Sequence, residues 1–228
     1  MTDDIKIALK MTNFSIQSKW MKALLIIFFV MGILFEFMPG AYTPNNLGGL
    51  YLMLTPAYLY QMVVTPTVSS YVAASQRKRD LQTKLPALVV TLGAIISFTL
   101  HVVLRWVNYN IYDYSGVESA YNTNCLSVIT ASFLFFLMAV YSGAAYKKFI
   151  VSLVFFMILL FPSMIFFMNP GILNSLGFVQ NITFSTAAIC GYIVILLGGL
   201  AMYLISLVLY KKGMDVKAFK AALARAGR

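Results

Sequence analysis

Six long apolar runs, separated by short polar stretches, dominate the pattern of this 228-residue chain. A helix that crosses the hydrocarbon core of a bilayer, about 30 Å thick, needs about 20 apolar residues. The pattern therefore predicts an all-α integral membrane protein with one transmembrane domain over residues 1–228. We expect its six spans at 21–39, 47–74, 86–107, 125–146, 149–168 and 182–210.

The basic residues predict the orientation of these spans. Sixteen of the seventeen Lys and Arg residues fall within 6–22, 77–84, 147–148 and 211–228, and only Arg105 lies elsewhere. Cytoplasmic loops of membrane proteins carry an excess of Lys and Arg. Two crossings between successive basic stretches place all four stretches, and both termini, on the cytoplasmic side.

The composition agrees with a membrane protein. The chain is 61% apolar and 11% charged, against about 25% charged residues in soluble domains. Its net charge of +10 resides in the predicted cytoplasmic stretches, where it meets anionic lipid headgroups, so we expect no nucleic-acid partner. Cys125 and Cys190 have neither metal-site spacing nor a disulfide pattern.

The N-terminal segment 1–20 is predicted to be an amphipathic helix on the inner membrane surface. Helical spacing places on one face Ile5, Leu9, Ile16 and Trp20. A second apolar stripe on the opposite face predicts a contact besides lipid, through Ile7, Met11 and Phe14. Residues 211–228 form a basic cytoplasmic tail.

Signatures of catalysis are missing from the sequence. It contains no HExxH, GxSxG or Asp-rich magnesium pattern, and no GxxxxGK[ST] loop that cradles nucleotide phosphates. We expect no catalytic residue, no metal site and no cofactor in this chain. If ATP drives its activity, a separate polypeptide hydrolyses that ATP.

Ionisable residues inside the spans are few. Glu36 lies near the outer end of the first span, and His101 and Arg105 lie in the outer part of the third. A proton- or sodium-coupled transporter usually needs a carboxylate deeper in the membrane, so this class is disfavoured. The His101–Arg105 pair is either a polar patch paired with Glu36, Asp113 or Glu118, or an interfacial anchor with Arg105 reaching outward. The anchor is the favoured interpretation.

The second and fifth spans carry prolines, which remove helical hydrogen bonds and favour kinks. The predicted kinks are at Pro56, Pro66 and Pro162. Either these helices are bent and line a pathway, or the prolines serve packing alone. The pathway candidates are Tyr58, Gln61, Met62, Phe161 and Met164.

The order of these parts resembles the permease subunits of type-2 ATP-binding-cassette (ABC) exporters, especially small bacterial forms encoded apart from their ATPase. The most specific piece is the turn ASQRKRDLQTKLP at 74–86, which looks like the coupling helix of that family. Family members commonly carry a glutamate early in this turn, where this chain has Ser75 and Gln76. The alternative is a stop-transfer charge cluster. The coupling candidates are Ser75, Gln76, Arg77, Lys78, Arg79 and Asp80.

The resemblance implies a non-enzymatic transport subunit in a bacterial plasma membrane. It implies a homodimer or heterodimer with a second permease subunit, bound to two copies of a P-loop ATPase that carries ATP and magnesium. The implied work is export of an amphipathic or hydrophobic peptide, antibiotic or lipid-like compound, through a pathway between two permeases. The alternatives are a non-transporting membrane protein (a scaffold, immunity factor or assembly factor) and, less favoured, a secondary transporter or channel.

Overall fold

The structure is a computed structural model that describes residues 18–38, 47–67, 72, 75–111, 118–145, 147–168 and 182–211. Within these residues the regular elements are all helices. Their bounds are α2 Ser18–Glu36, α3 Leu47–Thr67, α5 Lys78–Gln82, α6 Lys84–Ile111, α7 Glu118–Ala144, α8 Phe149–Met168 and α10 Phe184–Leu209. The predicted surface helix at 1–20 lies outside the described residues apart from 18–20, which begin α2. The tail lies outside them apart from Lys211.

Four helical segments in the described part of the chain are long and apolar enough to cross a membrane. They are Leu47–Thr67, Lys78–Ile111, Ala120–Ala144 and Phe184–Leu209. Together they identify an all-helical membrane protein. Two further apolar helices, α2 with 19 residues and α8 with 20, lie alongside them.

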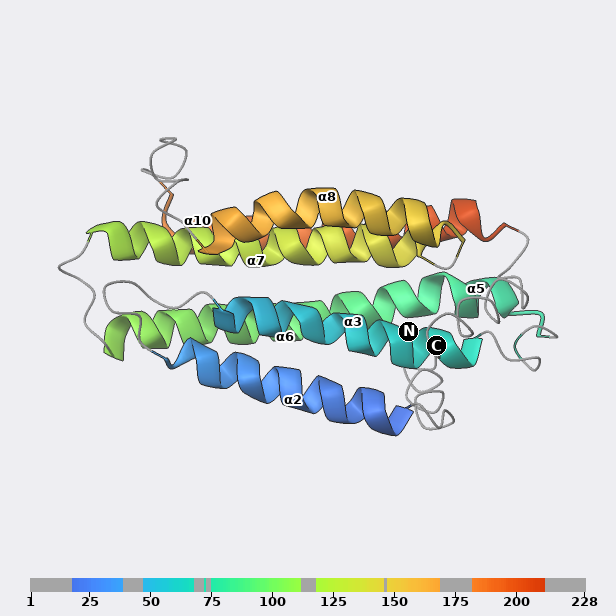
Figure 1. Cartoon of the computed structure of the whole chain (residues 1–228), viewed down its shortest axis with the longest axis horizontal. Helices are drawn as coiled ribbons and strands as arrows, with labels where there is room; N and C mark the ends of the chain where they lie inside the picture. Colours follow the sequence, from blue (N-terminus) through green and yellow to red (C-terminus); the bar gives the residue numbers. More distant parts are fainter. Residues whose placement is uncertain are drawn as a thin grey trace.

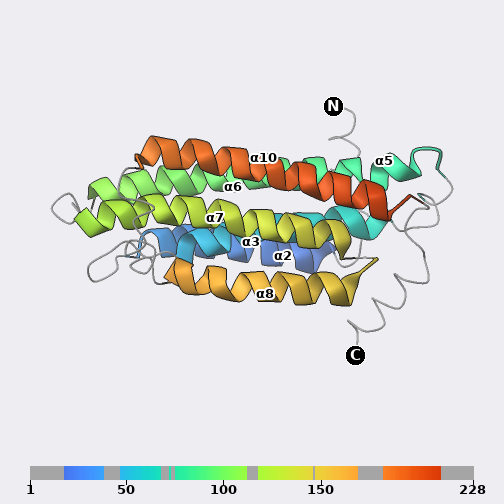
Figure 2. The ribbon, with the colours of Figure 1, turned by 90° about the horizontal axis from the view of Figure 1, so that it is seen from above.

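The helices pack side by side along one long axis (Figures 1 and 2). Helix α10 packs against α7 and α6, α3 packs against α2, α6 and α7, and α8 packs against α7. The shared core has buried side chains from α3, α6, α7 and α10, among them Leu52, Phe98, Phe135 and Met202.

Glycines let α10 approach α6 closely. A Cβ atom on Gly191 would lie 2.2 Å from Cζ of Phe98, and one on Gly199 would lie 2.1 Å from Oγ1 of Thr91. Small residues at helix contacts compensate for the missing hydrophobic driving force between helices in lipid. The contact between α6 and α10 therefore depends on the absence of side chains at these two positions.

Hydrogen bonds add to the packing between helices. The Tyr60 hydroxyl of α3 donates to the Ser142 carbonyl of α7 at 2.6 Å, and the Thr55 and Ser97 hydroxyls share a hydrogen bond of 2.9 Å between α3 and α6. In the turn between α7 and α8, the Lys147 ammonium donates to the carbonyl of Leu209 at the end of α10. A cation at a helix C-terminus also stabilises the helix dipole.

Candidate functional site

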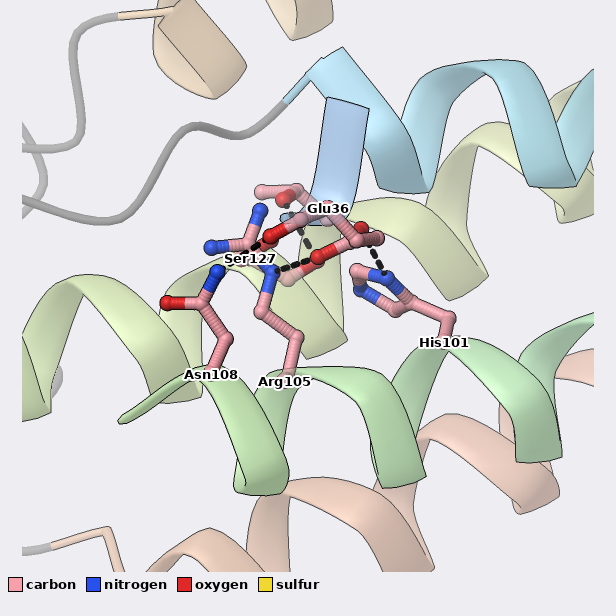
Figure 3. Close-up of polar contacts among 6 residues, drawn as sticks. Glu36, His101, Arg105, Asn108 and Ser127 are labelled. Atoms are coloured by element: carbon pink, nitrogen blue, oxygen red, sulfur yellow. Dashed lines mark hydrogen bonds and ion pairs between the residues drawn. The ribbon is translucent and has the colours of Figure 1, made fainter. Parts of the chain in front are cut away.

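A buried polar cluster joins α2 and α6 near the ends that lie away from α5 (Figures 1 and 3). We call Glu36, His101, Arg105 and Asn108 the Glu36 cluster. Glu36 is the last residue of α2, and the other three occupy successive turns of one face of α6. All four side chains are almost completely buried, with at most 1% of their surface exposed.

Three residues of α6 hold Glu36 by both its side chain and its backbone. Nδ1 of His101 lies 2.8 Å from Oε1 of Glu36, and Nε of Arg105 lies 2.9 Å from Oε2. The Asn108 amide donates to the backbone carbonyl of Glu36. Removing a charge from water costs several kcal/mol, and only a close partner offsets that cost. The geometry supplies such a partner for both Glu36 and Arg105.

Two glycines at the start of α3 make room for the cluster. A Cβ atom on Gly48 would lie 2.6 Å from Oε1 of Glu36, and one on Gly49 would lie 2.5 Å from Cε1 of His101. The first backbone N–H groups of a helix have no partner within that helix, and they give its N-terminus partial positive charge. The start of α3 therefore presents positive potential, rather than side chains, to the Glu36 carboxylate.

Helix α7 contributes uncharged polar side chains to the same end of the bundle. Ser127 lies beside Arg105 and Glu36 (Figure 3), and Asn124 is buried one helical turn before it. The Ser127 hydroxyl, the Asn124 side-chain oxygen and Nε2 of His101 have no hydrogen-bond partner among the described residues. The cluster is therefore polar beyond the groups that hold Glu36.

The predicted interfacial anchor at Arg105 is wrong. Its side chain is 1% exposed and points to Glu36, so it does not reach outward to the membrane surface. The Glu36 carboxylate, 2.9 Å from Nε of Arg105, is a partner within the bundle that offsets the cost of removing the guanidinium from water. Of the partners considered from the sequence, Glu36 is the one that the structure brings to Arg105. Asp113 and the side chain of Glu118 lie outside the described part.

A second candidate site lies at the opposite, basic end of the bundle (Figure 1). There α5 forms a short helix between α3 and α6. Leu81 of α5 packs beside Val63 of α3 and Leu85 of α6, and the buried Gln82 amide donates to the Thr67 carbonyl at 3.0 Å. Thr67 is the last residue of α3, so this bond satisfies a carbonyl that the helix itself leaves open. Helix α5 is thereby fixed to both neighbours.

The predicted coupling residues surround this short helix. Gln76, Arg77, Arg79 and Asp80 are exposed, whereas Ser75 and Lys78 are partly buried. The Ser75 hydroxyl accepts from the backbone N–H of Arg77 at 3.2 Å. Helix α5 thus buries its apolar side against the bundle and presents charged side chains outward.

The predicted pathway residues do not share one environment. Gln61 and Phe161 are exposed, Phe161 by 68%, while Met62 is buried. Tyr58 is partly buried, with its ring centroid 5.0 Å from that of Phe28 on α2. The side chain of Met164 is outside the described part. A pathway between two permease copies stays a prediction, because one chain supplies only half of its walls.

The predicted kink prolines all lie within helices. Pro56 and Pro66 belong to α3, and Pro162 belongs to α8. Each threonine before a proline in α3 donates to a preceding carbonyl: Thr55 to Leu52 and Thr65 to Gln61, both at 2.7 Å. The threonine hydroxyls thereby give hydrogen-bond donors to backbone carbonyls in the turn before each proline.

Sequence reasoning considered Glu36 as one of three possible partners of the His101–Arg105 patch but favoured the anchor, and it missed the role of the glycines. Two signals were available. His101, Arg105 and Asn108 repeat at the helical spacing that places polar groups on one face, and Gly48 and Gly49 stand side by side at the start of an apolar run. Neither signal names the partner, since Glu36 lies 65 residues before His101 in the chain.

Comparison with known proteins gives no assignment: no family model, no curated protein and no solved structure matches this chain. The candidate sites therefore rest on the residues and the geometry described above.

Proposed function

We propose that this protein is the six-span membrane subunit of an ABC exporter, with both termini in the cytoplasm of a bacterial cell. Helices α2 and α8 supply the two additional spans. With 19 and 20 residues at about 1.5 Å per residue, each is about 30 Å long, which matches the hydrocarbon core. The positive-inside rule then assigns the end with α5 to the cytoplasm.

The observation that carries the proposal is the way in which α5 is held. A membrane subunit without a nucleotide site responds to a partner ATPase only through a cytoplasmic segment that transmits force. Helix α5 meets this need because the Gln82–Thr67 bond and the packing of Leu81 fix it to α3 and α6. Movement of α5 is therefore transmitted to two membrane helices together.

The exposed side of α5 is suited to a protein partner. Arg79 and Asp80 of α5 and the preceding Arg77 all have exposed side chains. The proposed partner is a P-loop ATPase in two copies, which carries the ATP and magnesium. A second permease subunit completes the pathway for an amphipathic or hydrophobic substrate.

Site-directed photocrosslinking in cells tests the proposal. A photoreactive amino acid replaces Gln76 or Arg79, and a control carries it at Trp106, which is exposed at the opposite end. We expect crosslinks from the two α5 positions to a protein with a P-loop, and none from position 106. Failure of both α5 positions to crosslink to an ATPase would contradict the proposal and favour a non-transporting membrane protein.

Charge reversal then tests coupling itself. Arg77→Glu with Arg79→Glu is expected to reduce co-purification of the crosslinked ATPase, because two attractive contacts become repulsive. Lys148→Glu is the matched control, since Lys148 is exposed at the same end but lies outside α5. If the unmodified chain, the Arg77→Glu/Arg79→Glu double variant and the Lys148→Glu variant all recover the same amount of ATPase, α5 is ruled out as the coupling segment.

A further inference from the structure

The Glu36 cluster places ionisable groups within the depth of a membrane span. His101 lies ten residues before the end of α6 at Ile111, which is about 15 Å along the helix axis. Arg105 lies about 9 Å from the same end. Ionisable residues at such depth are costly, and in membrane proteins they mark ion pathways and proton relays. The proposed coupling through α5 makes no use of them.

The charges of the cluster balance when His101 is neutral. Glu36 contributes one negative charge and Arg105 one positive charge. An ionised carboxylate only accepts hydrogen bonds, so Nδ1 of His101 carries the proton in its 2.8 Å contact with Glu36. In neutral imidazole the other nitrogen, Nε2, then bears a lone pair. The cluster therefore ends in a basic nitrogen.

That nitrogen is buried and unused. Nε2 of His101 has no hydrogen-bond partner among the described residues, although the side chain is fully buried. Holding Glu36 needs only one donor, which a glutamine or asparagine amide supplies equally well. The second nitrogen is what distinguishes histidine at this position, and its distinguishing chemistry is to take up a proton.

The surroundings favour a proton over a larger ligand. Helix α3 offers Gly48 and Gly49 to the cluster, and their missing side chains leave just the space that Glu36 and His101 fill. Helix α7 offers the uncharged Asn124 and Ser127. The other charged side chains that the structure describes belong to the basic end of the bundle.

We propose that the Glu36 cluster is an intramembrane proton-binding site, in which Nε2 of His101 takes up the proton. The proton comes from a hydronium ion, which leaves as water, and one N–H bond forms. The resulting imidazolium remains hydrogen-bonded to Glu36 through Nδ1. The carboxylate of Glu36 then lies between two cations, since Oε1 contacts Nδ1 of His101 and Oε2 contacts Nε of Arg105. The site is independent of the ATPase partner.

Nitrogen NMR on the purified chain in lipid tests this directly, because His101 is the only histidine in the 228 residues. Histidine changes charge between about pH 8 and about pH 5. We expect a neutral ring protonated at Nδ1 at the upper end of that range and an imidazolium at the lower end. A ring that stays neutral throughout would overturn the proposal.

A variant tests the role of the carboxylate. Glu36→Gln removes the anion, so a proton on His101 would leave two buried cations, His101 and Arg105, without a counter-charge. We expect this variant to take up less proton than the unmodified chain. Equal uptake by a folded Glu36→Gln variant would also overturn the proposal.

His101→Gln is the matched control, because it keeps a donor for Glu36 and lacks the basic nitrogen. With a pH-sensitive dye, the unmodified chain is expected to take up one more proton than this variant over the same range. Equal proton uptake would contradict the assignment of the proton to His101. Neither readout involves an ATPase, so failure here leaves the proposed export function standing, and failure of the crosslinking experiment leaves the proton site standing.

Discussion

Separate and combined removal of the charges of Glu36 and Arg105 tests whether the buried ion pair holds α2 to α6. Glu36→Gln and Arg105→Met each leave one charge buried without its partner, at 1% exposure. Breaking a buried pair in this way costs about 3–5 kcal/mol. The double variant leaves no buried charge at the pair, so we expect it to be destabilised far less than the sum of the two single variants.

The free energy of unfolding is measured in mixed detergent micelles at increasing fractions of denaturing detergent. A double-mutant cycle then gives the coupling between the two residues, which we expect to be at least about 2 kcal/mol. Arg79→Met and Asp80→Asn form the control cycle, because both side chains are exposed. Single variants of Glu36 and Arg105 that each cost less than about 1 kcal/mol, with additive effects, would refute the buried ion pair.

Two further substitutions test the packing around the candidate sites. Gly49→Ala places a Cβ atom 2.5 Å from His101, so we expect the unfolding free energy to fall by about 1–3 kcal/mol in the same micelle assay; unchanged stability would contradict the close approach of α3. Gln82→Ala leaves the Thr67 carbonyl without its donor, so we expect faster hydrogen exchange across 78–82. Gln76→Ala, which changes an exposed side chain, is expected to leave that exchange unchanged, and equal rates in both variants would show that α5 is held by other means.

The apolar pattern predicted the helical class and the positions of the helical segments, because burial in lipid demands long apolar runs. It failed at boundaries where polar residues face the bundle. The start of α7 at Glu118 was missed, since Thr123 and Asn124 were counted as part of a polar loop although both are buried. Hydropathy alone does not distinguish a polar residue in a loop from one packed inside a helical bundle.

At the candidate sites too, local features were predicted from the sequence and the contact between distant residues was not. The short helix at 78–82 lies within the turn that the resemblance singled out, because its charges and its position between two spans are local features of the sequence. The pairing of Glu36 with Arg105 is a tertiary contact between α2 and α6, and the exposed-anchor prediction for Arg105 failed because one sequence does not reveal which distant residue faces it.

The glycines of α10 have a consequence for the order in which the bundle is assembled. During synthesis α10 leaves the ribosome after α2 to α8, so α6 with Thr91 and Phe98 is already in the membrane when α10 arrives. Helix α10 must then pack against a helix that is already in place, and at Gly191 and Gly199 an added Cβ atom would lie too close to Phe98 and Thr91 of α6. A bulkier residue at either position would therefore act as an assembly defect, leaving a chain whose earlier helices are inserted while α10 is not packed against α6.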